Sequence, residues 1–126
     1  MKNRYVIADI HGCLKTLRIL FEDQIQPDLS DQIYFLGDYI DRGPDSCGVI
    51  DYIIELQNKN YQLYPIRGNH EENLLKAYAE YDADTFEFFV MKNNSLCLID
   101  EDRKIKKKYY EFITNLPYYY ELDDFY

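Results

Sequence analysis

The sequence contains few of the features that mark a membrane protein or an exported protein. It has no tryptophan, only two histidines and three cysteines among 126 residues. The apolar run that starts at Tyr5 is interrupted by Asp9, so it is far shorter than the roughly 20 residues of a membrane helix and too short for a signal peptide. We therefore expect no membrane partner and a cytoplasmic location.

Basic side chains are also scarce. Lysine and arginine together number 14 against 23 aspartates and glutamates, which gives a formal net charge of −9. Such a chain repels a polyanionic backbone, so we expect no nucleic-acid partner. The local exception is Arg103, Lys104, Lys106, Lys107 and Lys108. This cluster is either the solvated face of a helix or a docking patch.

The cysteines Cys13, Cys47 and Cys97 are odd in number and include no CxxC pair. This pattern supports neither a disulfide framework nor a zinc knuckle, and it is typical of reduced cytosolic thiols. Cys13 follows His11 closely and is either a thiolate ligand or a core residue at the start of a helix. We favour the second interpretation.

The remaining composition is that of one globular domain. Hydrophobic residues make up 47% and charged residues 29% of a chain of 15.2 kDa.

Short apolar runs predict strands at 5–8, 33–36 and 61–66. Helical spacing predicts helices at 13–21 and 49–56, the second capped by Asp45 or Ser46. The apolar run at 33–36 does not alternate, which predicts a strand covered on both faces.

Strand and helix thus alternate in a βαβαβ pattern, and the polar residues Asp9, Asp38 and Asn69 follow the three strands. Parallel strands joined by right-handed crossovers bring such residues to one edge of the sheet. We therefore predict an α/β fold, with helices flanking a mainly parallel sheet. Further along, the pattern predicts helices at 71–81 and 103–115, is ambiguous at 86–91, and predicts a strand at 118–126. The tyrosines and phenylalanines after position 108 indicate core and sheet surface and not a base-stacking platform.

The three strand ends together carry a set of metal-ligating groups. They present Asp9 and His11, then Asp38 with Asp41 and Arg42, then Asn69 and His70. Carboxylate, imidazole and amide groups suit Mn²⁺, Fe²⁺ or Zn²⁺. Two cations about 3.5–4 Å apart polarise a phosphoryl oxygen and convert a bridging water to hydroxide. A single Asp or His after a strand is more often a turn residue, but here both histidines of the chain fall in this set.

Three motifs in this order, Asp9-Ile10-His11, Gly37-Asp38-Tyr39-Ile40-Asp41-Arg42-Gly43 and Gly68-Asn69-His70-Glu71, resemble those of calcineurin-like metallophosphoesterases. The Asp-Arg-Gly form is similar to the phosphoprotein phosphatase branch, which includes protein Ser/Thr phosphatases and symmetrical diadenosine tetraphosphatases. The resemblance covers residues 4 to about 75. It implies that the chain is half of a metallophosphoesterase sandwich.

The resemblance also implies a role for each motif residue. Asp9 and His11 match ligands of a first metal, Asp38 matches the bridging carboxylate, and Asn69 matches a ligand of the second metal. His70 matches the general acid and Asp41 the carboxylate that orients its ring. Arg42 matches a phosphate-binding guanidinium, with a structural ion pair to a motif carboxylate as the alternative. Arg67 and Glu71 receive no role beyond local structure.

The sequence departs from this family after His70. No further histidine or matching phosphate-binding arginine follows, so the second metal keeps only Asp38 and Asn69 and is under-ligated. We interpret residues 1–126 as a single metallophosphoesterase domain that is incomplete at its C-terminal side. The predicted strand at 118–126, rich in Tyr and Phe, would then be uncovered, which predicts self-association through it.

The expected activity is metal-dependent hydrolysis of a phosphoester, with a metal-activated hydroxide and His70 as general acid. Mn²⁺ is the first choice of metal, with Fe or Zn as alternatives. A phosphoprotein is the first choice of substrate and a dinucleoside polyphosphate the alternative. An alternative of another class is a catalytically incomplete fragment that binds metal or phosphate.

Overall fold

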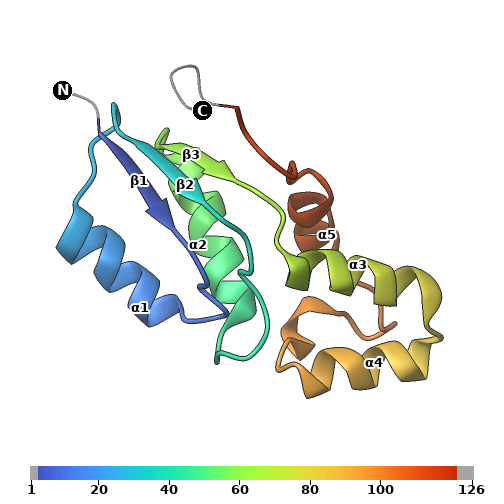
Figure 1. The fold of residues 1–126 in the computed structure, drawn as a ribbon. Coiled ribbons are helices and arrows are strands. Elements are labelled where there is room, and N and C mark those ends of the chain that lie inside the picture. The colour runs from blue at the N-terminus through green and yellow to red at the C-terminus, as the bar shows by residue number, and fades with distance from the viewer. Residues whose placement is uncertain (1–2, 122–126) are drawn as a thin grey trace.

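A parallel three-stranded sheet forms one side of the molecule (Figure 1). The computed structural model describes residues 3–121. The strands are β1 (Arg4–Ile7), β2 (Gln32–Phe35) and β3 (Gln62–Pro65), in the order β1-β2-β3. Arg4 pairs with Gln32, and Gln32 pairs with Gln62, so the strands lie in register. The predicted parallel βαβαβ unit is therefore confirmed.

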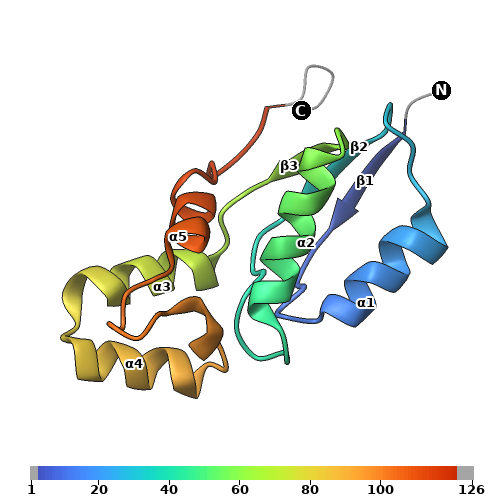
Figure 2. The ribbon, with the colours of Figure 1, turned by 180° about the vertical axis from the view of Figure 1, so that it is seen from behind.

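The two crossovers pack on one face of this sheet. They are α1 (Leu14–Ile19), which continues as the π-helical turn η1 (Leu20–Ile25), and α2 (Ser46–Asn58). Helix α1 contacts α2, as expected when successive right-handed crossovers run in one direction (Figure 2). The Asp45 carboxylate caps α2 by accepting a hydrogen bond from the backbone N–H of Gly48 at 2.7 Å.

The other face of the sheet is covered by no helix in the described part of the chain, and Tyr120 packs there on Tyr34 and Tyr64. On β2, Ile33 and Phe35 are fully buried under the helices, whereas Tyr34 points to the opposite side and is half-buried. Val6 is 63% exposed and Leu36 49% exposed on that side. The expectation that the 33–36 strand is covered on both faces is thus wrong within residues 3–121, because both crossover helices lie on one face.

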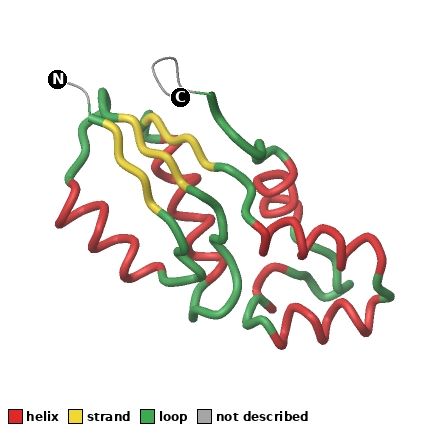
Figure 3. The backbone as a smooth tube through the Cα atoms, viewed as in Figure 1, coloured by secondary structure: helices red, strands yellow, loops and turns green. Residues whose placement is uncertain are grey.

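A helical layer lies beyond β3 (Figure 3). It comprises α3 (Asn69–Glu80), α4 (Ala83–Lys92), the 3₁₀ turn η2 (Leu96–Leu98) and α5 (Lys107–Thr114). The ambiguous segment 86–91 is therefore helical. Helix α5 begins four residues later than predicted, because Ile105 pairs with Ile99 in an isolated antiparallel bridge. Of the basic cluster, only Lys107 and Lys108 lie in the helix.

The predicted strand at 118–126 is wrong for residues 118–121, and its remainder lies outside the described residues. Instead of pairing with a strand, Tyr120 lies across β3. Its ring meets the Tyr64 ring edge-on at 5.4 Å, and its hydroxyl donates to the Pro65 carbonyl at 3.3 Å. Side-chain contacts thus replace the backbone ladder here.

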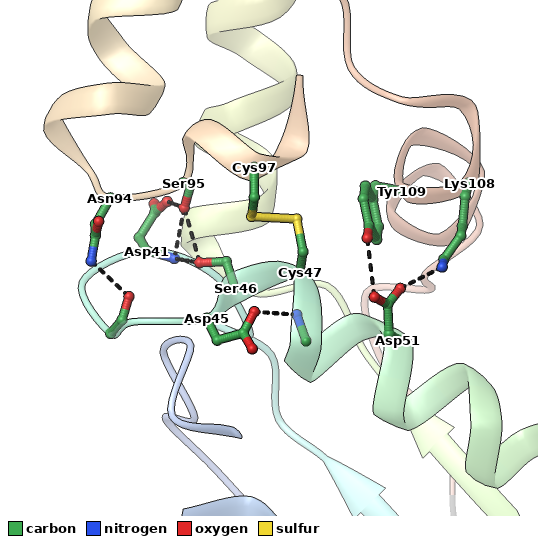
Figure 4. Close-up of a disulfide and its surroundings, with 12 residues drawn as sticks. Asp41, Asp45, Ser46, Cys47, Asp51, Asn94, Ser95, Cys97, Lys108 and Tyr109 are labelled. Carbon is green, nitrogen blue, oxygen red and sulfur yellow. Dashed lines mark hydrogen bonds and ion pairs between the residues drawn. A yellow bond between two sulfur atoms is a disulfide. The ribbon is translucent and has the colours of Figure 1, made fainter. Parts of the chain in front are cut away.

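The cysteine prediction is also wrong, because Cys47 and Cys97 form a disulfide (Figure 4). Cys47 lies in the first turn of α2 and Cys97 in η2. The two elements are 50 residues apart in sequence but in contact in the fold. Such a pairing has no signature in sequence spacing, because the fold alone brings the two segments together. Cys13 is free and exposed, so it is not a core residue.

No helix within residues 3–121 is long and apolar enough to cross a membrane.

Candidate active site

The turns after β1 and β2 run side by side at the carboxyl edge of the sheet. The backbone N–H of His11 donates to the carbonyl of Asp38 at 2.9 Å, and that of Gly12 donates to the carbonyl of Tyr39 at 2.8 Å. These bonds continue the β1-β2 pairing past the strand ends. The polar residues after the two strands therefore face one another, as the topology predicts.

Asp9, His11 and Asp38 form a cluster with the chemistry of a divalent cation site. One ligand atom from each lies within 4.8 Å of the other two. The Nδ1 atom of His11 lies 3.0 Å from the carbonyl oxygen of Ile40 and donates to it. In the neutral tautomer with this bond, Nε2 is the nitrogen with a free lone pair, and hydrogen bonds of this kind orient histidines that bind metals. The donor set fits a borderline or hard divalent ion.

Asn69 begins α3 beside this cluster, and its side chain is exposed. The next residue, His70, donates its backbone N–H to Asp38 Oδ1 at 2.9 Å. The start of α3 is thereby attached to the central carboxylate. From residues 3–121, Asp38 and Asn69 are the candidate ligands for a second cation.

His70 and Asp41 form a close pair. The His70 Nδ1 atom lies 2.8 Å from Asp41 Oδ2, and the Asp41 carboxylate is almost completely buried. A carboxylate in this position fixes the tautomer with a proton on Nδ1 and stabilises the charged imidazolium ring. The rings of His70 and His11 meet edge-on with centroids 4.7 Å apart, so the pair adjoins the cluster of Asp9, His11 and Asp38.

Five candidate residues have left-handed backbone conformations, which are costly for residues other than glycine. They are Asp9, His11, Asp38, Asp41 and Arg42, with φ angles of 53°, 41°, 59°, 75° and 71°. Strain of this kind persists only where the surroundings hold it, and it concentrates at functional sites. Arg42 is exposed and forms no ion pair within residues 3–121, so the alternative of a structural ion pair with Asp9, Asp38 or Asp41 is not observed.

The turn after β3 approaches the turn after β2 through two glycines. Gly37 has a φ of +98°, and a Cβ atom added to it would lie 2.5 Å from the backbone N and Cα of Gly68. Only residues without a side chain permit this approach. It brings Asp38 next to the start of α3, which carries Asn69 and His70.

Glu71 has a larger part in the site than the sequence indicated. Its side chain is fully buried and accepts hydrogen bonds from four backbone N–H groups: those of Asp38 at 2.7 Å, Tyr39 at 2.8 Å, Gly68 at 2.9 Å and Ile40 at 3.3 Å. Burial raises the pKa of Glu71, and these N–H groups oppose the rise. Glu71 therefore holds together the turns that carry Asp38 and His70. The sequence held one indication of this role, which is that Glu71 belongs to the Gly-Asn-His-Glu motif.

Arg67 has the local structural role that the sequence suggested. Its guanidinium donates to Glu72 at 2.9 Å, to the Tyr118 hydroxyl at 2.8 Å and to the Thr114 carbonyl at 2.9 Å. It thus attaches α3 and the end of α5 to the turn after β3.

The comparisons with known proteins agree with this geometry. Residues 3–125 match the calcineurin-like phosphoesterase family, and the chain belongs to that family. A symmetrical bis(5'-nucleosyl)-tetraphosphatase of Buchnera aphidicola subsp. Schizaphis graminum is 35% identical over 116 residues, which are 80% of this chain and 41% of that protein. The protein of the same description from Wigglesworthia glossinidia brevipalpis is 40% identical over 79 residues, which are 62% of this chain and 28% of that protein.

Among solved structures, a protein described as a diadenosine tetraphosphatase superposes with a TM-score of 0.57 at 24% identity. The superposition covers 89% of this chain and 41% of that one. At this sequence identity, the structural similarity shows that the two chains share a fold. The chain spans about two fifths or less of the length of the two curated relatives named above.

Proposed function

We propose that this chain carries the metal-binding and acid-donating half-site of a hydrolase that cleaves phosphoric esters or anhydrides. The observation that supports it best is the Asp9, His11 and Asp38 cluster lying next to the His70–Asp41 pair, in a member of a phosphoesterase family. The two groups would have different roles in such a reaction. The Asp9, His11 and Asp38 cluster would bind cations, and the His70–Asp41 pair would transfer a proton.

The side chains of Asp9, His11 and Asp38 would hold one divalent cation, and Asp38 with Asn69 would contribute to a second. When bound, such cations neutralise charge on the phosphoryl group and lower the pKa of coordinated water. We propose Mn²⁺ as the metal, with Fe and Zn as alternatives. The second site draws two protein ligands from residues 3–121, so we expect it to bind more weakly.

His70 would donate a proton to the leaving oxygen. Its bond to Asp41 stabilises the imidazolium ring that carries the proton and keeps the ring in one orientation. Arg42 projects from the same turn as Asp41 and is exposed, so its planar guanidinium would bind two oxygens of a substrate phosphate.

For the substrate, we propose a phosphorylated small molecule or protein. The curated relatives are named as symmetrical bis(5'-nucleosyl)-tetraphosphatases, which favours a dinucleoside polyphosphate. A phosphoprotein, the first choice from the sequence, requires the same chemistry. We propose a cytoplasmic location.

Hydrolysis of p-nitrophenyl phosphate with added Mn²⁺ tests the proposal. The wild-type chain and Asp38→Asn are compared, with Asp102→Asn, an exposed carboxylate away from the site, as the matched control. We expect Asp38→Asn to abolish the metal-dependent rate and Asp102→Asn to retain it. Equal rates in all three proteins would contradict the proposal. Diadenosine tetraphosphate and a phosphoserine peptide, as competing substrates, then separate the two classes.

The second candidate function is metal or phosphate binding without turnover. It is favoured because residues 3–121 supply only Asp38 and Asn69 as candidate ligands for a second cation. Calorimetric titration with Mn²⁺ separates the two candidates: one tight equivalent per chain and no hydrolysis support binding alone, whereas two tight equivalents exclude it.

Self-association of the chain stays a prediction. Tyr118 and Tyr119 are 61% and 69% exposed, although residues 118–121 form no strand. Sedimentation velocity over a range of concentrations tests it, with Tyr119→Ser as the variant expected to favour the monomer.

A further inference from the structure

The Asp41–His70 pair contacts a segment that lies outside the three sequence motifs. Residues 93–95 follow α4 and contact the turn that carries Asp41 (Figure 4). The carbonyl of Asn93 accepts the backbone N–H of Arg42 at 2.9 Å. The Asn94 side chain donates to the Gly43 carbonyl at 2.9 Å. The left-handed turn at Asp41 and Arg42 is thereby fixed by groups about 50 residues away in sequence.

Ser95 makes the most direct of these contacts. Its hydroxyl donates to Asp41 Oδ1 at 2.6 Å and accepts the Asp41 backbone N–H at 3.1 Å. The other carboxylate oxygen, Oδ2, bonds to His70. The two oxygens of the Asp41 carboxylate thus bond to Ser95 on one side and to His70 on the other.

Ser46 completes a directional chain of hydrogen bonds. Its hydroxyl lies 3.0 Å from that of Ser95 and accepts the Asp41 backbone N–H at 2.9 Å. Since Ser95 donates its only hydroxyl proton to Asp41, Ser46 must donate to Ser95. The chain runs from Ser46 through Ser95 to the Asp41 carboxylate, and successive donors of this kind strengthen one another. Both serines are completely buried, so water does not compete.

The disulfide lies beside this chain. Cys47 directly follows Ser46, and Cys97 lies two residues after Ser95, so the covalent bond limits the separation of the two hydroxyl groups. The cluster thus joins α2, the segment after α4 and the turn after β2.

We propose that Ser95 is a positioning residue that fixes the tautomer and orientation of His70 through Asp41. This inference rests on the proposed function for its consequence in catalysis. The orientation itself is measurable without any turnover.

Nuclear magnetic resonance tests the proposal directly, because the chain contains only two histidines. In the ¹⁵N-labelled, metal-free chain at neutral pH, long-range ¹H–¹⁵N spectra show two imidazole rings, and His70→Asn assigns them. We expect the His70 ring to carry its proton on Nδ1. In Ser95→Ala that proton exchanges at least about tenfold faster, as expected when a hydrogen bond to a charged group is lost. Ser95→Thr, which keeps the hydroxyl, restores the wild-type signal.

Ser46→Ala is the matched control. It removes a buried hydroxyl from the same cluster but leaves the Ser95–Asp41 bond in place, so we expect a similar loss of stability with a smaller effect on the His70 proton than in Ser95→Ala. Equal effects of the two alanine variants on His70, or none from a folded Ser95→Ala, would overturn the proposal.

If Ser95→Ala does not fold, the test is made on the wild-type chain. The signal of the buried Ser95 hydroxyl proton must then be observable and slow to exchange, and its absence overturns the proposal. Failure of the phosphatase assay would leave these results intact and contradict only the proposed function.

Discussion

Glu71 shows how one buried carboxylate organises two turns at once. Its four backbone N–H partners belong to the turn after β2 and the turn after β3. Its neighbour Glu72 is half-buried and bonds to Arg67 and Tyr118. Adjacent residues of the same type thus have different roles, which makes them a natural pair for comparison.

Glu71→Gln is expected to lower the free energy of unfolding by about 2 kcal/mol or more, because the amide NH₂ cannot accept and leaves buried N–H groups without partners. Urea unfolding followed by circular dichroism measures the change. Glu72→Gln is the control, with an expected loss below about 1 kcal/mol. A loss from Glu71→Gln as small as the control would show that the four bonds contribute little.

The pH dependence of stability should differ between wild type and Glu72→Gln. The Arg67 guanidinium bonded to Glu72 holds the pKa of that carboxyl below its usual value. Because the folded-state pKa is the lower one, the contribution is present above the unfolded-state pKa and is lost as pH falls through the folded-state pKa. Urea unfolding at about pH 7 and about pH 3 should therefore show a smaller acid-induced loss in Glu72→Gln. An identical loss in both proteins would contradict this assignment.

At the scale of elements, the predictable part of the fold is the part with local signals. The three strands and α2 follow from apolar runs, turn residues and the Asp45 cap, and the meeting of Asp9, Asp38 and His70 follows from parallel topology. The contribution of Ser95 was not predictable, because a serine after a helix has no periodicity or motif that distinguishes it. The same holds for Cys47 and Cys97, whose distance depends on how α2 packs against η2.

The disulfide between α2 and η2 is expected to stabilise the fold substantially. It closes a loop of 50 residues, for which the chain-entropy relation gives about 4 kcal/mol. Unfolding with and without a phosphine reductant measures the effect, and Cys47→Ala/Cys97→Ala, in which reductant should change nothing, is the control. No difference between oxidised and reduced wild type would mean that packing alone holds η2 on α2.

At the scale of the whole molecule, the acidic excess should weaken the folded state. A formal charge of −9 on a chain of this size produces self-repulsion that salt screens. Raising the ionic strength from about 0.01 M to about 0.15 M should increase the free energy of unfolding by up to about 1 kcal/mol. Sodium and potassium chloride should act alike. An effect confined to one cation would indicate specific binding instead of screening.

The sheet and the helical layer also differ in when they can assemble during synthesis. Arg4 lies opposite Gln32 and Gln32 opposite Gln62, so all three strands can pair once residue 65 has left the ribosome. Asp9, His11 and Asp38 can then already be gathered at the edge of the sheet. Ser95 and Cys97 emerge some thirty residues later. The nascent chain would therefore acquire the edge that carries Asp9, His11 and Asp38 first, and the contacts of Ser95 with Asp41 only when the segment after α4 folds back onto α2.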